Sequence, residues 1–220
     1  MGLIQDFTGN PDQFLKDNAI VVGDQTEHGG SQPPGVANFF MKRGKQNVVY
    51  LERKSMVGPK DVLKAYWLPW KSKTGVPLTL GTEAEWLFTS GMTNCRFSVL
   101  SNSNDVAIKV AHVAGDLNSS QKRTDWEEGA GSGFVTDKST QRVRRMSRSG
   151  AELHQYLGQG KSDDDSSTAF VFGHYESGEW KFYAQVIKGF RTVENTTFGL
   201  ASNIEILSVK SPLSNLPVAN

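Results

Sequence analysis

The stretch from residue 95 to residue 112 reads Cys-Arg-Phe-Ser-Val-Leu-Ser-Asn-Ser-Asn-Asp-Val-Ala-Ile-Lys-Val-Ala-His. Both halves alternate apolar residues with polar or small ones, as strands with one buried face do. A turn-prone run of serine and asparagine separates the halves, which predicts a β-hairpin. A two-residue loop and a four-residue loop both predict one register. The directly opposed pairs in that register are Val99 with Ile108, Phe97 with Val110, and Cys95 with His112.

Similar short runs, rich in Val, Ile, Phe, Tyr and Trp, recur along the chain between clusters of Gly, Asn, Ser and Pro. We expect strands at Ala19–Val22, Asn47–Arg53, Ala65–Trp70, Val76–Leu80, Glu85–Phe88, Cys95–Leu100, Asp105–Ala114, Ala169–Tyr175, Glu179–Lys188 and Asn203–Val209. Two helices are predicted, one capped by Asn10 with Pro11 in its first turn, the other from Ser149 to Gly158. This rhythm predicts a β-rich α+β fold, with a central β-sandwich of mixed and antiparallel sheets flanked by a few helices.

Composition bounds the class of protein. The 220 residues are 37% hydrophobic, and no repeat or linker divides them, so we expect one domain over residues 1–220. A net charge of +1 supplies no field that would draw the chain to nucleic acid or to an anionic membrane, and we expect neither as a partner. Without a signal sequence or a long apolar run, we expect a soluble monomer whose route out of its cell, if it has one, is not displayed.

Cys95 is the only cysteine, which excludes an intrachain disulfide and a cysteine-based zinc cluster. In the predicted register, its Cβ atom lies roughly 4.5–5.5 Å from that of His112. An imidazole can accept the thiol proton or, as imidazolium, stabilise the thiolate that acts as nucleophile. The pair therefore indicates acyl transfer, unless both residues merely fill a core.

Three segments resemble the glutamine deamidase domain shared by the Burkholderia lethal factor and the cytotoxic necrotizing factors. They are Trp-Leu-Pro-Trp-Lys at residues 67–71, Thr-Ser-Gly-Met-Thr-Asn-Cys at residues 89–95 with the following strand to His112, and, more weakly, Asp-Trp-Glu-Glu-Gly at residues 125–129. The similar part spans about a third of the chain. The length of the whole chain is similar to that of the single-domain lethal factor.

The resemblance implies a role for each matching residue. Cys95 matches the nucleophile, His112 the general base, and Thr89 a threonine near the active site of the family. Met-Thr-Asn precedes Cys95 where the family often has Leu-Ser-Gly, and the oxyanion or rim candidates are Asn94 and Gly91. No metal and no cofactor is required by this chemistry.

The family also implies a biological role. We expect a secreted or host-delivered toxin and virulence factor that converts a glutamine of a host protein to glutamate through a Cys–His thioester mechanism. The target would be a translation initiation helicase of the DEAD-box type, with translation inhibition as the result, or a Rho-family GTPase. Transglutamination would follow if an amine replaced water.

Two other functions stay open. A papain-like cysteine protease would use the same residue types, but it usually places its nucleophile at the start of a helix, and Cys95 begins a strand-like run. A non-enzymatic β-sandwich binding module would use Cys95 as a core residue. A basic run at Arg142, Arg144, Arg145 and Arg148 is expected to be a solvated face, with docking to an acidic partner as the alternative.

Overall fold

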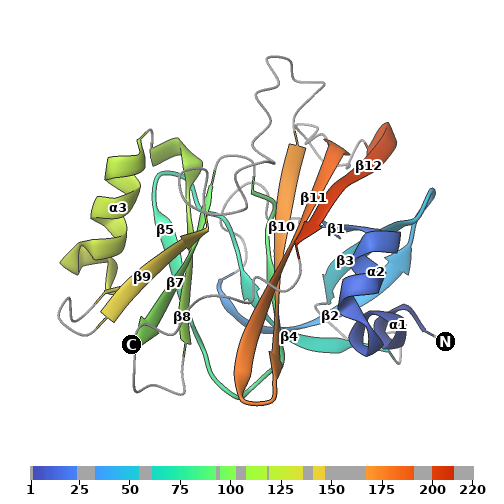
Figure 1. The fold of residues 1–220 in the computed structure, drawn as a ribbon, viewed down its shortest axis with the longest axis horizontal. Coiled ribbons are helices and arrows are strands. Elements are labelled where there is room, and N and C mark those ends of the chain that lie inside the picture. The colour runs from blue at the N-terminus through green and yellow to red at the C-terminus, as the bar shows by residue number, and fades with distance from the viewer. Residues whose placement is uncertain are drawn as a thin grey trace.

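Twelve strands lie in two sheets within the residues that the computed structural model describes (Figure 1). These residues are 2–23, 33–54, 61–92, 95–102, 108–117, 119–135, 141–146, 167–190 and 200–210. The described helices are α1 (Leu3–Gly9), α2 (Pro11–Asp17) and α3 (Ser120–Glu128), with short 3-10 turns η1 (Gly115–Leu117) and η2 (Ala130–Ser132).

The larger sheet is mixed. Its strands are β1 (Ala19–Gly23), β2 (Gly35–Arg43), β3 (Val48–Lys54), β4 (Leu63–Leu68), β6 (Trp86–Thr89), β10 (Ser167–Glu176), β11 (Glu179–Phe190) and β12 (Leu200–Lys210). They lie in the order β1-β3-β2-β4-β6-β10-β11-β12, and the pairs β1–β3 and β4–β6 are parallel. The other neighbours are antiparallel.

The smaller sheet is antiparallel throughout. Its strands are β5 (Gly75–Leu80), β7 (Arg96–Asn102), β8 (Ile108–Val113) and β9 (Gln141–Met146), in the order β5-β8-β7-β9. The chain passes from the larger sheet to the smaller one between β6 and β7, and Met92 still pairs with Ala169 of β10 on the way. This crossing brings residues of both sheets to the start of β7.

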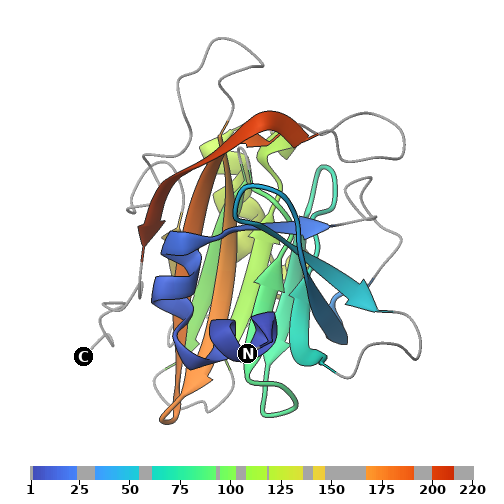
Figure 2. The ribbon, with the colours of Figure 1, turned by 90° about the vertical axis from the view of Figure 1, so that its right-hand side faces the viewer.

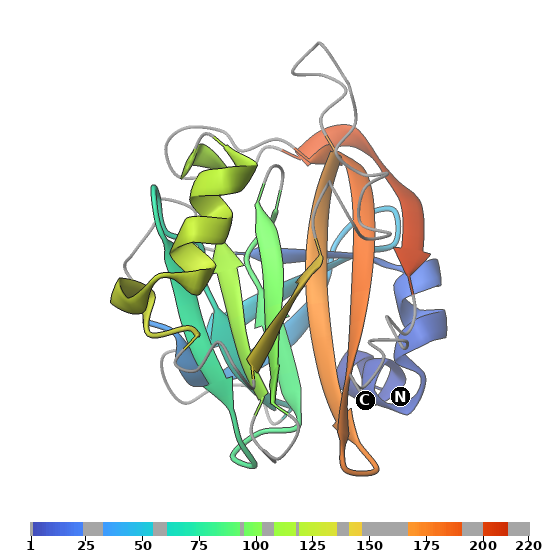
Figure 3. The same ribbon diagram turned by 60° about the vertical axis from the view of Figure 1, so that its left-hand side comes forward.

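Three apolar clusters separate the layers. One fills the space between the sheets and contains Leu68, Leu87, Phe97, Val110 and Phe182 among others. A second lies on the far face of the larger sheet, where α1 and α2 cover it (Figure 2). The third lies between the smaller sheet and α3, which crosses the outer face of that sheet (Figure 3). The chain thus has a β-rich α+β fold, as predicted, with helices on both outer faces.

Helix α2 begins where the sequence predicts. The Asn10 side chain accepts a hydrogen bond from the Gln13 N–H at 3.1 Å, and Pro11 occupies the first turn. A buried glutamine of β11 then anchors the end of the helix to the sheet. Gln185 donates to the Leu15 and Asn18 carbonyls at 2.5 and 2.7 Å, and accepts from the Ile20 N–H at 2.7 Å. Both ends of this amide are satisfied, so its burial costs little.

The expected strands all appear, with ends displaced by a few residues. The sequence reading missed α1, α3, β2 and β9, and the helix expected from Ser149 to Gly158 lies outside the described residues. Strand β2 was missed because Phe39 is its one buried residue, so its sequence lacks the alternation of a half-buried strand. Helix α3 was missed because nearly all of its side chains are polar.

Candidate active site

The β7–β8 hairpin has a register that differs from the predicted one by two residues. Phe97 lies opposite His112, and Val99 lies opposite Val110. The expected pairing of Cys95 with His112 is therefore wrong, because the register of the hairpin is centred one residue later in the chain than assumed. A shift of two leaves every side chain on its expected face, since the side-chain period of a strand is two.

Cys95 lies directly before β7 and belongs to the apolar cluster between the sheets, together with Phe97. Because Phe97 is opposite His112, the cysteine is the diagonal rather than the direct neighbour of the imidazole. Diagonal residues on one face are roughly 7–8 Å apart at the backbone, a span within reach of aromatic and long side chains such as the imidazole. Cys95 is 8% exposed, so a narrow part of its surface reaches solvent.

His112 is fully buried in the middle of the smaller sheet. It lies on β8 between Val76 of β5 and Phe97 of β7. Its Nδ1 atom is 3.3 Å from the Ser90 hydroxyl oxygen, and Nε2 has no hydrogen-bond partner among the described residues. A buried ring nitrogen without a partner costs free energy unless a ligand or water reaches it, and the indole nitrogens of Trp67 and Trp180 are in the same state among the described residues.

Burial lowers the pKa of His112 from its ordinary 6.5 to about 3, and the Leu68 backbone carbonyl, which stabilises a protonated ring, opposes this shift in part. The imidazole is consequently neutral at physiological pH. Of the two ways in which it could activate a thiol, the neutral ring supports one: it accepts the proton as a base. A preformed thiolate–imidazolium pair would need a charged ring in an apolar setting, which desolvation opposes.

Two adjacent hydroxyls at the end of β6 have different partners. The Thr89 hydroxyl accepts a hydrogen bond from the Val171 N–H at 3.1 Å and so occupies a place in the sheet ladder. Ser90, which the sequence reading did not single out, meets His112 instead. Both side chains are buried. Thr89 thus lies near the candidate site, as the resemblance implied, but its hydroxyl is already engaged with the backbone of β10.

Two backbone N–H groups in the described residues shortly before Cys95 are already hydrogen-bonded. The Ser90 N–H donates to the Leu68 carbonyl at 3.2 Å, and the Met92 N–H donates to the Ala169 carbonyl at 2.8 Å. Neither can bind a second acceptor without losing its first. Gly91 lies between them and is half-buried, whereas Asn94 lies outside the described residues. Gly91 and Asn94 remain predictions as oxyanion or rim groups.

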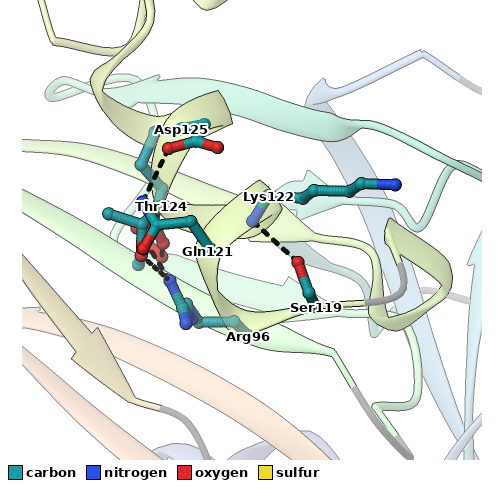
Figure 4. A network of polar contacts seen from close by, with 8 residues as sticks. Arg96, Ser119, Gln121, Lys122, Thr124 and Asp125 are labelled. Atoms are coloured by element: carbon teal, nitrogen blue, oxygen red, sulfur yellow. Dashed lines mark hydrogen bonds and ion pairs between the residues drawn. The ribbon is translucent and has the colours of Figure 1, made fainter.

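The opposite face of β7 carries a buried ion pair. Arg96 donates to the Glu127 carboxylate at 2.9 Å and to the Thr124 hydroxyl at 3.2 Å, which joins the strand to α3 (Figure 4). The Ser98 hydroxyl donates to the other oxygen of Glu127. The side chains of Arg96 and Glu127 are 2% and 0% exposed. Residues 125–129, the weakest of the three similar segments, therefore contribute Glu127 to an ion pair with Arg96, the residue that follows Cys95.

Most of the basic run lies in a strand, and its expected solvated face stays a prediction. Residues 141–146, which include Arg142, Arg144 and Arg145, form strand β9 and pair with β7. Arg148 lies outside the described residues. The run is thus part of the smaller sheet, next to the strand that follows Cys95.

No group of three or more His, Cys, Asp or Glu side chains within the described ranges could hold a metal ion. Of the helices in this part of the chain, none has the length and apolar character needed to cross a membrane. No protein-family model and no curated protein matches the sequence.

Proposed function

We propose that the chain is a cysteine-dependent glutamine deamidase, in which Cys95 is the nucleophile and His112 the general base. The observation that carries this proposal is the buried Nε2 atom of His112, which has no hydrogen-bond partner among the described residues, on the sheet face that also carries Cys95. Nucleophilic acyl transfer requires a base that can take the proton of the thiol, and a neutral imidazole on the same sheet face supports that role.

The reaction balances with these two groups and one water. The Cys95 sulfur attacks the carboxamide carbon of a glutamine side chain while His112 takes the thiol proton. The imidazolium returns that proton to the departing nitrogen, so ammonia leaves and a thioester remains. Water then attacks the thioester, with His112 as base again, and the sulfur regains its proton as glutamate leaves.

The imidazolium that forms in each half of the cycle is charged in an apolar site. The burial that lowers the pKa of His112 also makes the protonated ring a stronger acid, so it donates its proton readily to the leaving nitrogen. The Leu68 carbonyl stabilises the protonated ring during its short lifetime. His112 therefore transfers the proton from the thiol to the leaving nitrogen, and its protonated form is only transient.

Likeness of the three sequence segments to the deamidase toxins supports the substrate class. By that likeness, the target is a glutamine of a host protein, either an initiation helicase of the DEAD-box type or a Rho-family GTPase, and the chain acts as a toxin. The position of Cys95 before a strand argues against a papain-like protease, whose nucleophile begins a helix.

A non-enzymatic binding module is the second candidate, and one observation favours it. Cys95 is 8% exposed and lies among apolar side chains, as a structural cysteine would. The two functions differ in whether the thiol is reactive in the folded protein.

The test is mass spectrometry of a host-cell lysate treated with the protein, searched for glutamine converted to glutamate. Cys95→Ser is the matched control, and a purified DEAD-box initiation helicase and a purified Rho-family GTPase are tested separately. We expect conversion by the wild type at few glutamines and none by the variant. The same converted sites with both proteins, or no site with either, would end the proposal.

A further inference from the structure

Ser90 has two polar partners at the point where β6 ends and the chain leaves the larger sheet. Its N–H donates to the Leu68 carbonyl at 3.2 Å, so its backbone is fixed to β4. Its hydroxyl oxygen lies 3.3 Å from His112 Nδ1, across the space between the sheets. Ser90 is 3% exposed and His112 is 0% exposed, so water does not compete for this contact.

The neighbouring hydroxyl cannot take this role. Thr89 is as close in sequence to the candidate nucleophile, but its oxygen accepts the Val171 N–H at 3.1 Å. A turn of that side chain toward His112 would leave the buried Val171 N–H without a partner, which is unfavourable. Of the two adjacent hydroxyls, Ser90 is the one placed to act on the imidazole.

The partners of His112 determine which nitrogen carries its proton. The Ser90 hydroxyl oxygen faces Nδ1, and a hydroxyl oxygen can accept a hydrogen bond from a protonated nitrogen. With the proton on Nδ1, the hydroxyl oxygen accepts a hydrogen bond from it and Nε2 keeps its lone pair. That nitrogen has no other hydrogen-bond partner in the described part of the chain.

We propose that Ser90 is a positioning residue, which holds the His112 ring with its proton on Nδ1 and leaves Nε2 as the base for Cys95. The inference rests on the proposed function for its catalytic meaning, because a base is needed only if Cys95 is a nucleophile. The position of the proton is nevertheless a property of the folded protein alone, and it can be measured without a substrate.

The experiment compares Ser90→Ala with Ser98→Ala in protein labelled with nitrogen-15 at histidine. Ser98 is a matched control, because it is also a buried serine whose hydroxyl donates a hydrogen bond, but it faces Glu127 on the other side of β7. Each variant loses one buried hydrogen bond, and urea unfolding of both variants shows that they are folded. Nitrogen shifts of His112 near pH 7 report which ring nitrogen is protonated.

We expect the wild-type spectrum to have the proton on Nδ1. Ser90→Ala should raise the fraction with the proton on Nε2 and slow alkylation of Cys95 by about tenfold or more, whereas Ser98→Ala should change neither. In the deamidation assay, kcat should fall in Ser90→Ala with little change in KM.

Several results would overturn the inference. One is a wild-type ring with its proton on Nε2, which needs no variant to fold. Another is an unchanged proton position and alkylation rate in Ser90→Ala, or an equal loss in Ser98→Ala. Failure of the proposed function has a different signature: the wild type converts no glutamine, while the proton position and its response to Ser90→Ala are as expected.

Discussion

The two faces of the smaller sheet carry buried polar groups that differ in their hydrogen-bond and ion-pair partners. On the outer face, Arg96 and Ser98 of β7 meet Glu127 of α3, and this charged group is compensated by an ion pair and hydrogen bonds. On the inner face, His112 of β8 is equally buried, yet one of its nitrogens has no partner among the described residues. Residues that alternate along β7 and β8 thus face either the ion pair with α3 or the space between the sheets.

The difference separates a structural role from a chemical one. A buried ion pair fixes how a helix sits on a sheet, because a change of position would weaken the contact between the two charges. A buried base with an unpartnered nitrogen does not position any element. It also lowers the free energy of unfolding at any pH where the unfolded ring would be protonated but the folded ring must stay neutral. We interpret the outer face as the support of β7, and the inner face as the place where chemistry occurs.

Loss of the thiol should give the largest effect. Cys95→Ser is expected to lower deamidation by about 10³-fold or more, because a hydroxyl is a far weaker nucleophile than a thiolate. The change removes almost no volume, so the free energy of unfolding should fall by no more than about 1–2 kcal/mol. Deamidation assays and urea unfolding measure the two quantities. A variant as active as the wild type would assign Cys95 to the core.

Breaking the outer-face ion pair should give the largest loss of stability. Glu127→Gln removes the carboxylate charge from its 2.9 Å contact with the buried Arg96 guanidinium, and we expect a loss of about 3–5 kcal/mol in urea unfolding. The double variant Arg96→Met with Glu127→Leu should recover most of that loss, because it buries no charge. If the single variant lost less than about 1 kcal/mol, the contrast between the faces would fail.

The inner face should make stability depend on pH. Because the pKa of His112 falls to about 3 in the folded state, its contribution to stability is complete above its unfolded pKa and is lost as the pH falls from there toward 3. Between pH 6.5 and 4.5, the wild type should lose about 1.4 kcal/mol per pH unit relative to His112→Gln.

His174 is the matched control for this titration. Burial also lowers its pKa, with Glu176 and Glu85 opposing the shift, but the ring is only half-buried and stacks on Trp86. His174→Gln should therefore remove a smaller part of the same slope. A stability difference between wild type and His112→Gln that stays constant with pH would contradict a buried neutral imidazole.

The smallest effect tests how closely α3 packs on the outer face. A Cβ atom at Gly75 would lie 2.4 Å from the Trp126 ring, which in turn stacks on Phe134. Gly75→Ala should cost about 1–3 kcal/mol, because the ring must move. At Gly81 the nearest atom, the Tyr66 hydroxyl oxygen, is 3.5 Å away, so Gly81→Ala is the control with an ordinary contact. Equal thermal stability of the two variants would mean that α3 packs loosely.

The face of each side chain on β7 and β8 was predictable from the sequence, but the register was not. Alternation places Phe97, Val99, Val110 and His112 on one side whatever the loop length, provided that the shift is even. The loop length was uncertain because every residue from Ser101 to Asp105 is turn-prone. Cys95 and His112 therefore share a face as predicted, while their direct pairing was wrong.

Contacts between elements that are distant in the chain could not be predicted from the sequence. Ser90 meets His112 because the end of β6 in one sheet packs over β8 in the other, and no local pattern encodes that placement. Glu127 lies in a helix whose sequence is almost entirely polar, so its burial depends on Arg96 and Ser98 being present on the strand beneath. The caps and strand rhythm are local properties, and these were the features that the sequence predicted well.

Alkylation of Cys95 by iodoacetamide at pH 7 tests the central claim most directly, because it reports the activation of the thiol by His112 without any substrate. The account predicts that the folded wild type reacts, and that His112→Gln reacts more slowly by about tenfold or more. A thiol that stays inert until urea unfolds the protein, or one that reacts equally fast in both proteins, would contradict it.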